Sequence, residues 1–458
     1  MRSADEYLAG LRDGREVYYR GERVADVVAH PELGLAARHG TLDFHGPSLE
    51  PSPYYALPRS PEDLRARSAL IEESTRRGRT LVVLIKEIGT DALFALHRVT
   101  HGTDAYDRVA AYYEHCRDGD LALAVAQTDV KGDRARTPSA QDDPDLYLRI
   151  VDRSDEGIVV RGAKVHTSYA ANADELIVIP TRSLAPGEED WAVGFALPVA
   201  TPGLKLFCSD FLHGTDDAFT HPISSGRKMI ETLTVFEDVL VPWERVFLAG
   251  DVEAAGRVAL GFVEYHRMTA VSYKLPLLDA LVGLGFALAE ANGIARASHV
   301  REKLTWLIAY VESVRALIHA ACDRAGIDPA SGLAYPDPLL TNIAKWTFAR
   351  DYYPAVERVI DLGGGLLVTG LGGADWASEQ VRPYMEKYFA AAAPAEERLA
   401  LINLASDLLA RGYAGYQGVL AVHAEGSLEA EKMMVFRSYD RGPAAAYARE
   451  LAGLAGAE

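Results

Sequence analysis

LYLRIVDRSDEGIVVRGAKVH, residues Leu146 to His166, is the stretch that decides the fold. Apolar and polar residues alternate on both sides of the polar segment RSDEG, a pattern typical of two strands joined by a tight turn. It therefore predicts a β-hairpin. Further short β-type runs extend from Leu121 to about Pro242: LALAVAQT, ELIVIPT, WAVGFALPV, LKLFC and TLTVFEDVLVP. The middle of the chain is thus predicted to be an all-β domain, a sandwich or a barrel.

Helical patterns flank this β region. Before it, SPEDLRARSALIEESTRRG, GTDALFALHRV and AYDRVAAYYEHC carry apolar residues at helical spacing, and the first opens with a Ser-Pro capping signal. After it, the helical period returns from about Arg257 and includes a long run from Pro276 to Asp323. We therefore expect an α+β chain with an N-terminal helical domain (1–120), a middle β domain (121–256) and a C-terminal helical bundle (257–458).

Composition and charge restrict the class of partner. The 458 residues carry a formal net charge of −18, which argues against nucleic-acid and acidic-membrane partners because both require a basic surface. No run of about 18 apolar residues and no signal peptide is found, so we expect a cytoplasmic protein without a membrane span. Cys116, Cys208 and Cys322 lie far apart and favour buried thiols over a disulfide framework or a cysteine-rich metal site.

Three glycine-containing segments carry groups that suit a ligand. QTDVKGDR, from Gln127 to Arg134, can present backbone N–H groups and cations to a phosphate or a flavin edge. GAKVHTSYA, which begins at Gly162, ends a strand with hydroxyl groups that can bond a ring nitrogen. A solvated loop and an ordinary strand edge remain alternatives. The glycines of DLGGGLLVTGLGG, from Asp361, lack dinucleotide-binding spacing, and a helix end is the alternative.

The segment YHRMTAVSYK, from Tyr265 to Lys274, concentrates reactive side chains just before the long apolar helix. Metal ligands, an acid–base site and the polar end of a helix are the three interpretations. No HxxxH or ExxH pair accompanies His266, which disfavours a metal. Histidine is a natural general acid or base near neutral pH. The neighbours Arg267, Tyr273 and Lys274 strengthen the acid–base interpretation, because each requires a polar partner if buried.

The order of helical, β and helical segments resembles the acyl-CoA dehydrogenase-like architecture. Five strings narrow the resemblance: QTDVKGDR, GIVVRGAKVHTSYAANADELIVIPT, ETLTVFEDVLVPWERVF, YHRMTAVSYK and HAEGSLEAEKMMVFRSYD. In this order they are similar to the superfamily of 4-hydroxyphenylacetate 3-monooxygenase and 4-hydroxybutyryl-CoA dehydratase, over roughly residues 1–440. The resemblance implies FAD, held between the middle domain and the C-terminal bundle of a homotetramer or dimer.

The resemblance also implies which residues line the flavin. They come from the QTDVKGDR loop, from the strand end TSY and from the C-terminal segment HAEGS. They are Lys131, Gly132, Asp133, Arg134, Ser168, Gly426 and Ser427. Ser168 stands where the superfamily usually has a threonine near the flavin ring.

The dehydratase branch of the superfamily adds an iron–sulfur cluster held by three cysteines and one histidine. His266 matches that histidine, whereas Leu96, Thr100 and Tyr273 occupy the cysteine positions. Such clusters require thiolates, so the resemblance implies a cluster-free member without a metal site. Glu231 matches an active-site glutamate of this branch.

The hydroxylase branch hydroxylates a phenol with reduced FAD and oxygen. Tyr106 matches a tyrosine of its substrate pocket, whereas Gly102 and Val125 occupy the positions of a pocket arginine and histidine. The phenol pocket is thus partly kept, which implies a different substrate or reaction. The candidate catalytic residues are His266, Tyr106, Tyr273, Glu231 and His101.

The first expected function is a two-component monooxygenase, in which a separate flavin reductase supplies FADH2 and a flavin C4a-hydroperoxide hydroxylates an aromatic or related small substrate. A flavin-dependent dehydratase, isomerase or oxidase without the cluster is the second, with His266 as base, and a non-catalytic scaffold is the third. The substrate can be free, linked to coenzyme A or tethered to a carrier protein. Apolar residues on more than one face of the long helices favour a homo-oligomer, a tetramer first.

Overall fold

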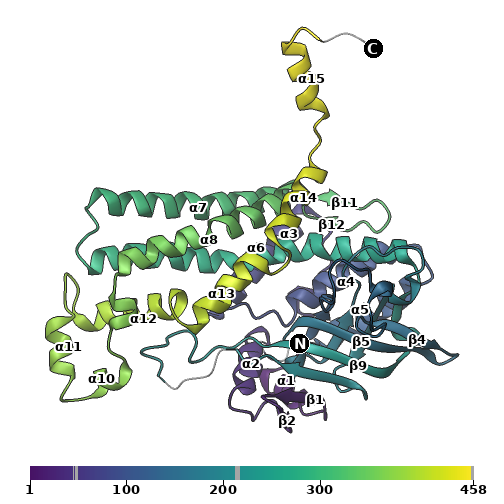
Figure 1. The fold of residues 1–458 in the computed structure, drawn as a ribbon, viewed down its shortest axis with the longest axis horizontal. Helices are drawn as coiled ribbons and strands as arrows, with labels where there is room; N and C mark the ends of the chain where they lie inside the picture. Colours follow the sequence, from purple (N-terminus) through teal and green to yellow (C-terminus); the bar gives the residue numbers. More distant parts are fainter. Residues whose placement is uncertain (45, 47–49, 212–216, 455–458) are drawn as a thin grey trace.

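The computed structural model describes residues 1–44, 46, 50–211 and 217–454, and its first helices divide between the β region and the central helical region (Figure 1). These helices are α1 (Ala4–Gly10), α2 (Leu33–Gly40), α3 (Pro61–Arg77), α4 (Glu87–Thr100) and α5 (Tyr106–Asp118). Ser60 caps α3 by accepting a hydrogen bond from the Asp63 amide, and Pro61 occupies the first turn. The capping signal in the sequence is therefore confirmed.

Two β-sheets share one apolar core. Their strands are β1 (Glu16–Tyr19), β2 (Glu22–Val24), β3 (Leu123–Ala126), β4 (Arg149–Arg153), β5 (Gly157–Ser168), β6 (Glu175–Val178), β7 (Val193–Pro198), β8 (Leu204–Cys208), β9 (Glu231–Pro242) and β10 (Val246–Ala249). One sheet has the order β2-β1-β8-β9-β5-β4 and the other β10-β7-β6-β3. Phe195 of β7 and Phe236 of β9 meet edge to face, with ring centroids 5.8 Å apart, and join the sheets.

The predicted hairpin is confirmed, since β4 and β5 pair antiparallel and the Ser154 amide donates to the Gly157 carbonyl at 2.9 Å. Strands β3 to β10 all lie within residues 121–256. Two strands before this range were not predicted. β1 pairs parallel with β8, and β2 pairs with β1 at the sheet edge. Three or four residues carry too little alternation to be recognised, so the N-terminal region was predicted as a helical domain and its two strands were missed.

A helical region follows the sheets. Its elements are α6 (Val252–Ala291), α7 (Ser298–Asp323), β11 (Gly326–Ile327), β12 (Ala334–Tyr335), α8 (Pro338–Gly363), α9 (Leu366–Thr369), α10 (Gly373–Ala377), α11 (Arg382–Tyr388), α12 (Ala395–Leu409), α13 (Gly412–His423), α14 (Leu428–Ser438) and α15 (Gly442–Leu451). The run expected from Pro276 to Asp323 is thus two helices. Gly364, at a φ of +71°, follows α8, so the glycine-rich segment is a helix end.

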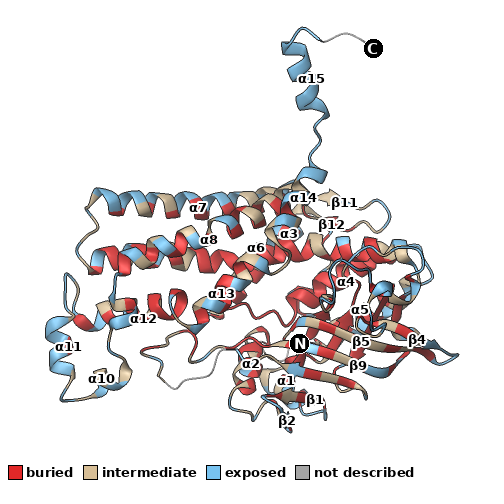
Figure 2. Ribbon diagram, viewed as in Figure 1, coloured by how far each residue is buried: buried red, intermediate tan, exposed pale blue. Residues whose placement is uncertain are grey.

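Helix α6 is the central helix of the fold, and it packs against α3, α4, α7 and α8. Pro276 lies inside it, so YHRMTAVSYK lies in the middle of the helix and not before it, as was expected. Figure 2 shows how much of α6 is buried. By length and composition α6 is a candidate membrane span that was not predicted. However, 67% of its apolar window is buried inside the protein, as in a core helix.

Candidate functional site

His266 lies on the buried side of α6 and meets α4. Its Nδ1 atom is 3.1 Å from Asp91 Oδ2, and its ring stacks on Phe262 at 5.0 Å. Asp91 is fully buried, and its other carboxylate oxygen accepts hydrogen bonds from Arg67 at 2.7 Å and Thr269 at 2.9 Å. A carboxylate held in this way fixes the orientation of the imidazole and leaves Nε2 as the atom that can exchange a proton with a ligand.

Two turns further along α6, Tyr273 and Lys274 contact the C-terminal loop that follows α13. The Tyr273 hydroxyl donates to Glu425 Oε1, and Lys274 Nζ lies 2.5 Å from Glu425 Oε2. Glu425 and Gly426 both have a left-handed backbone, with φ values of +57° and +122°. The loop therefore turns sharply and brings the Glu425 side chain onto the helix.

The two predicted cofactor residues of this loop have structural partners. A Cβ atom at Gly426 would lie 2.6 Å from the Arg267 guanidinium, so the position favours glycine. The Ser427 hydroxyl accepts a hydrogen bond from the backbone of α14 and caps that helix. Arg267 donates to the Glu425 carbonyl at 3.1 Å and to the side chain of Asn342 on α8. The loop is thus held against both α6 and α8.

Four charged side chains form what we call the buried ion cluster: Lys274, Lys345, Glu425 and Glu431. Lys345 Nζ lies 3.7 Å from Glu425 and 3.6 Å from Glu431. Burial is the main cause of each pKa displacement. It lowers the pKa of both lysines, for Lys274 well below the usual value, and raises the pKa of both glutamates, for Glu425 well above it. The neutral and charged forms are therefore closer in free energy than in water, which suits groups that exchange protons.

The sheet supplies the opposite wall of the site. Ser168 on β5 and Glu231 on β9 are paired in register, and the Ser168 hydroxyl donates to both carboxylate oxygens at 2.9 Å. Burial raises the pKa of Glu231 to about 7, against the effect of this hydrogen bond. Burial is also the main cause of the raised pKa values of Glu425 and Tyr416, and the charge of Glu231 adds to both. Glu231 is therefore within electrostatic range of Glu425 and Tyr416.

A narrow cavity of about 10 Å³, roughly the space of one water molecule, opens beside Tyr273 and Lys274. Its walls are mostly apolar and come from α6, α8, α13 and the segment before α4. They are formed by Tyr273, Lys274, Leu277, Phe348, Gln417, Leu420, Ala421, Thr80, Leu81 and Val82. On α13, the buried Tyr416 hydroxyl has no hydrogen-bond partner among the described residues. The cavity therefore combines apolar walls with the polar groups of Tyr273, Lys274 and Gln417.

The QTDVKGDR loop follows β3, and residues 131–134 are all exposed. Tyr147 anchors the loop by donating a hydrogen bond to the Lys131 carbonyl at 2.8 Å. Partial desolvation lowers the pKa of Lys131, and the charges of Arg134 and Arg182 lower it further. Three cations, Lys131, Arg134 and Arg182, therefore lie within electrostatic range of one another. The chain as a whole has a net charge of −18. Such a group is suited to bind an anion.

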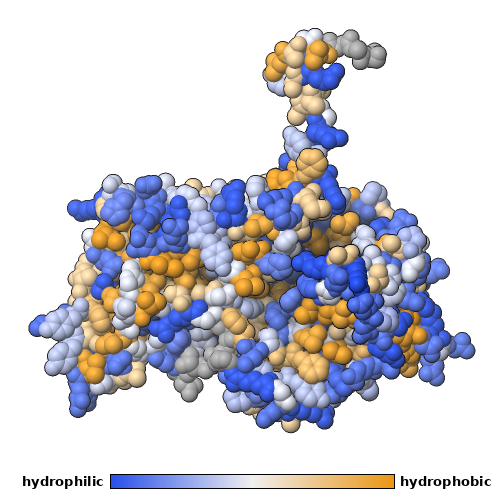
Figure 3. Space-filling model, in the orientation of Figure 1, coloured by the Kyte–Doolittle hydropathy of each residue, from blue (hydrophilic) through white to orange (hydrophobic). Residues whose placement is uncertain are grey.

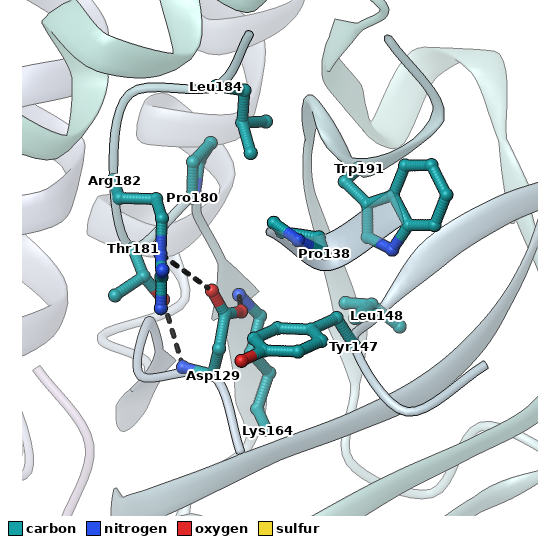
Figure 4. Close-up of a pocket in the computed structure, with 10 residues that line it drawn as sticks. All are labelled: Asp129, Pro138, Tyr147, Leu148, Lys164, Pro180, Thr181, Arg182, Leu184 and Trp191. Carbon is teal, nitrogen blue, oxygen red and sulfur yellow. Dashed lines mark hydrogen bonds and ion pairs between the residues drawn. The ribbon is translucent and has the colours of Figure 1, made fainter. Parts of the chain in front are cut away.

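A polar pocket lies at the base of this loop (Figure 4). Within it, Asp129 pairs with Lys164 Nζ at 2.5 Å and lies 3.9 Å from the Arg182 guanidinium. The rings of Tyr147 and Trp191 form one side. The indole Nε1 of Trp191 is buried without a hydrogen-bond partner in the described part of the chain. The ion pair anchors the start of the loop to the sheet.

The predicted residues His101 and Tyr106 lie at the turn between α4 and α5. Their rings are 4.8 Å apart, and the His97 ring packs 5.1 Å from Tyr106. Asp91, the partner of His266, lies ten residues before His101, about 15 Å along the helix axis. The structure thus places His101 and Tyr106 in an aromatic cluster that is separate from His266.

Of the other predicted catalytic residues, His266 and Tyr273 lie on α6 and Glu231 lies on β9. Tyr273 bonds Glu425, whose pKa responds to the charge of Glu231. His266 lies seven residues before Tyr273, on the same face of α6 and about 10 Å away along the axis. Sequence reasoning missed Asp91, Lys345, Glu425 and Glu431. The signal for Asp91 and Lys345 was a charge within an apolar helical segment, GTDALFAL and NIAKWTF, where burial requires a partner.

Leu96, Thr100 and Tyr273 occupy the positions that match the cysteine ligands of the dehydratase branch, and none of them carries a thiol. Thr100 donates a hydrogen bond to the Leu96 carbonyl within α4, while Tyr273 bonds Glu425. In the described residues, no group of three or more His, Cys, Asp or Glu side chains is arranged to hold a metal ion. These residues do not fit an iron–sulfur cluster, whose irons require thiolate ligands.

Comparison with known proteins identifies the family of the chain. Family models of the 4-hydroxyphenylacetate 3-hydroxylase N terminal and C terminal match residues 3–248 and 255–453. The chain belongs to the 4-hydroxyphenylacetate 3-hydroxylase family. Over 440 residues it is 31% identical to the 4-hydroxyphenylacetate 3-monooxygenase oxygenase component of Thermus thermophilus, with 91% of this chain and 90% of the relative covered.

Two further comparisons bear on the chemistry. Over 500 residues the chain is 29% identical to 4-hydroxybutyryl-CoA dehydratase/vinylacetyl-CoA-Delta-isomerase of Clostridium aminobutyricum, covering 99% of this chain and all of the relative. A crystal structure of a 4-hydroxyphenylacetate 3-monooxygenase oxygenase component complexed with FAD matches with a TM-score of 0.92 and 28% identity, covering 98% of each chain. The predicted superfamily and its acyl-CoA dehydrogenase-like fold are confirmed.

Glu231→Gln should stabilise the fold at alkaline pH. The pKa of Glu231 rises from 4.5 in the unfolded chain to about 7 in the folded chain. The folded chain therefore binds more protons between these values, and its stability falls as the pH rises through them. Glutamine does not ionise, so we expect a gain in the free energy of unfolding that grows to at most about 3 kcal/mol above pH 7.

Urea denaturation at pH 5, 6.5 and 8 measures this gain. Glu244→Gln, at an exposed position after β9, is the matched control and should change little at any pH. A difference between Glu231→Gln and the parent that stays constant from pH 5 to pH 8 would contradict the assignment.

Proposed function

We propose that the chain is the oxygenase component of a two-component monooxygenase that uses reduced FAD to hydroxylate an aromatic or related small substrate. One observation carries the proposal: Tyr273 and Lys274 line a narrow, mostly apolar cavity and bond Glu425, while Ser168 and Glu231 pair on the sheet. Membership of the 4-hydroxyphenylacetate 3-hydroxylase family supports it.

The residues at this junction fit a flavin. Lys131, Arg134 and Arg182 form an exposed cation group that suits the pyrophosphate. The Ser168 hydroxyl can bond a ring nitrogen, and the unpartnered Tyr416 hydroxyl is a further buried hydrogen-bonding group. The related oxygenase component binds FAD in its crystal structure. When bound, reduced FAD supplies the reaction with molecular oxygen.

The side chains of this chain then have separate tasks. Asp91 holds the His266 imidazole so that Nε2 can move a proton to or from the substrate. Tyr273 and Lys274 position the substrate at the cavity, where the Tyr273 hydroxyl can exchange Glu425 for a substrate oxygen. The apolar walls exclude water, which limits side reactions. For Tyr106, a role in the substrate pocket rests on its match to the hydroxylase branch.

A flavin-dependent dehydratase or isomerase without the iron–sulfur cluster is the second candidate function. The buried ion cluster favours it, because acid and base groups at one cavity can remove and replace protons on an acyl substrate. Full-length similarity to the clostridial dehydratase also supports it. In that reaction His266 would act as the base, and no oxygen atom would enter the product.

The same proposal implies two kinds of partner, a flavin reductase and a small-molecule substrate. Relatives described as oxygenase components imply a separate flavin reductase that delivers reduced FAD. The substrate is a small molecule, free or linked to coenzyme A or a carrier protein, and a net charge of −18 disfavours nucleic acid. We further propose a homotetramer located in the cytoplasm.

Isotope labelling distinguishes the two functions. The purified chain receives reduced FAD, 18O2, catalase and a panel of phenols and hydroxyacyl-CoA esters, and the products are analysed by mass spectrometry. A monooxygenase adds one 18O atom to a phenol product. Conversion of an acyl ester under argon, with no labelled phenol formed under oxygen, would refute the monooxygenase and support the dehydratase.

Arg134→Ala should weaken the binding of FAD. A charge-assisted contact contributes about 1.5–3 kcal/mol, and solvent screening at this exposed position reduces that value. We expect the dissociation constant to rise about three- to tenfold in fluorescence titrations. Arg153→Ala, on the exposed β4–β5 hairpin, is the control and should leave the affinity unchanged. Equal affinities of Arg134→Ala and the parent would exclude this loop from the FAD site.

His266→Ala should lower turnover by about 10²–10⁴-fold, the usual effect of removing a general acid or base. FAD affinity should be largely kept, because the QTDVKGDR loop and Ser168 are unchanged. Steady-state oxygen uptake and FAD titration measure the two effects separately. His299→Ala, at an exposed position of α7, is the matched control. Full activity in His266→Ala would remove this histidine from the mechanism.

A further inference from the structure

A short turn, residues 221–226, lies between β8 and β9 in the sequence and packs against α12. Asp407 of α12 is fully buried, and it accepts hydrogen bonds from the Ile223 and Ser224 amides, both at 2.9 Å, and from the Ser224 hydroxyl at 2.7 Å. His221 Nδ1 lies 3.8 Å from the same carboxylate. The turn is therefore fixed against α12, and the Asp407 carboxylate is already bound to it.

Three arginines surround this turn, and we call them the arginine cluster: Arg79, Arg227 and Arg411. Arg79 Nη1 donates to the Pro222 carbonyl at 3.0 Å, and Arg411 Nη1 lies 3.4 Å from His221 Nε2. Arg227 follows the turn in sequence and donates to its last carbonyl at 3.0 Å. The charges therefore come from three segments: the connection before α4, the segment before β9 and the start of α13. Figure 3 shows hydrophilic side chains near the junction of α12 and α13.

No carboxylate in the described part of the chain pairs with any of these three arginines. Guanidinium groups stay protonated at neutral pH, so all three carry a charge. Arg227 Nε is buried and has no hydrogen-bond partner among the described residues. Burial lowers the pKa of Arg227, and the charge of Arg79 lowers it further. Like charges within electrostatic range of each other cost free energy, and an anion bound between them would remove that cost.

The start of α13 adds hydrogen-bond donors beside the arginine cluster. Arg411 is the N-cap residue, and its side chain does not cap the helix. Gly412, the first residue of α13, is exposed and has no side chain to cover the first amides. Burial raises the pKa of Tyr413 in the same turn, and the charge of Arg227 opposes this rise, so the two groups are within electrostatic range. The first amides and the helix dipole both favour an anion.

We propose that the arginine cluster and the start of α13 bind a phosphate monoester. Guanidinium groups present planar pairs of N–H donors that match the oxygens of a phosphate. A phosphate monoester carries about −1.5 to −2 charges at neutral pH, whereas a carboxylate or a phosphate diester carries a single charge. Three cations around one point therefore match the monoester best. The phosphates of FAD are diesters, so the ligand of this site is a second molecule.

The proposed phosphate site adjoins the cavity of the candidate functional site. Thr80, the neighbour of Arg79 in sequence, lines that cavity. Gln417 also lines it and donates to the Tyr413 hydroxyl at 2.7 Å. A substrate bound at the cavity can therefore place a phosphate on the arginine cluster, which would make these arginines determinants of substrate choice. This role in substrate choice rests on the proposed function, whereas the binding of a phosphate does not.

Titration calorimetry of the purified full-length chain at low ionic strength tests the binding. The probes are inorganic phosphate and adenosine monophosphate, with acetate as the singly charged comparison. Both phosphates should bind more tightly than acetate, and added salt should weaken their binding. Arg227→Gln should raise both phosphate dissociation constants about five- to tenfold, and the double variant Arg79→Gln, Arg227→Gln should raise them further. Arg301→Gln, at an exposed position of α7, is the matched control and should bind like the parent.

A second titration, at saturating FAD, separates this site from the flavin site. Both phosphate affinities should be unchanged, because the flavin is proposed to bind through Lys131 and Arg134. Displacement of the probes by FAD would assign the arginine cluster to the flavin and overturn the proposal. No binding at millimolar concentration, or a double variant that is folded by its unfolding midpoint and binds like the parent, would overturn it as well. Tighter binding of adenosine monophosphate than of inorganic phosphate would support a nucleotide as the source of the phosphate, and equal affinities would support free phosphate.

These titrations require no turnover, so they stand or fall independently of the isotope-labelling experiment. For any phosphate-bearing substrate found by that experiment, the double variant should raise KM at least several-fold and leave kcat unchanged. The KM of a substrate without a phosphate should stay at the parent value. An unchanged KM for the phosphate-bearing substrate would refute the role of the cluster in substrate choice.

Discussion

Burying much of the forty-residue helix α6 in the middle of the protein forces each polar or charged side chain on its buried face to find a partner inside the fold. An unpaired buried charge costs several kcal/mol. His266 therefore pairs with Asp91 of α4, and Lys274 pairs with Glu425 of the C-terminal loop. These two contacts connect the N-terminal helices and the end of the chain to one central helix.

The same constraint gives the site its acid–base character. Burial raises the pKa values of Glu231 and Glu425 and lowers that of Lys274, so neutral and charged forms are close in free energy. Groups of this kind can serve a hydroxylation, in which a proton is exchanged with a phenol, or a dehydration, in which protons are moved on an acyl chain. Relatives of this chain include both a monooxygenase component and a dehydratase.

Much of the fold could be predicted because its signals are local. The alternation around RSDEG, the Ser60 cap and the helical periodicity each involve only a few neighbouring residues. The strands β1 and β2 were missed because both are short and because β1 pairs with β8, a strand about 190 residues later. The start of α6 was misplaced because Pro276 normally marks a helix beginning, whereas here it lies inside a helix held by packing.

The candidate site was predicted less completely, for a related reason. His266, Tyr273 and Glu231 could be named from motifs, but their partners come from distant segments. Tyr273 and Glu425 are 152 residues apart in sequence, and no local pattern records such a contact. His101 and Tyr106 are close together in sequence and in space, but they lie apart from the groups on α6. Contacts between distant segments therefore decide which of the candidates share a site.

A crystal structure of the protein soaked with FAD tests the central claim most directly, because it locates the flavin ring relative to both walls. We expect ring density between Ser168 and Glu231 on the sheet and Tyr273 and Lys274 on α6, with the pyrophosphate near Arg134. Ring density elsewhere on the chain, or none at saturating FAD, would contradict the claim that this junction is the active site.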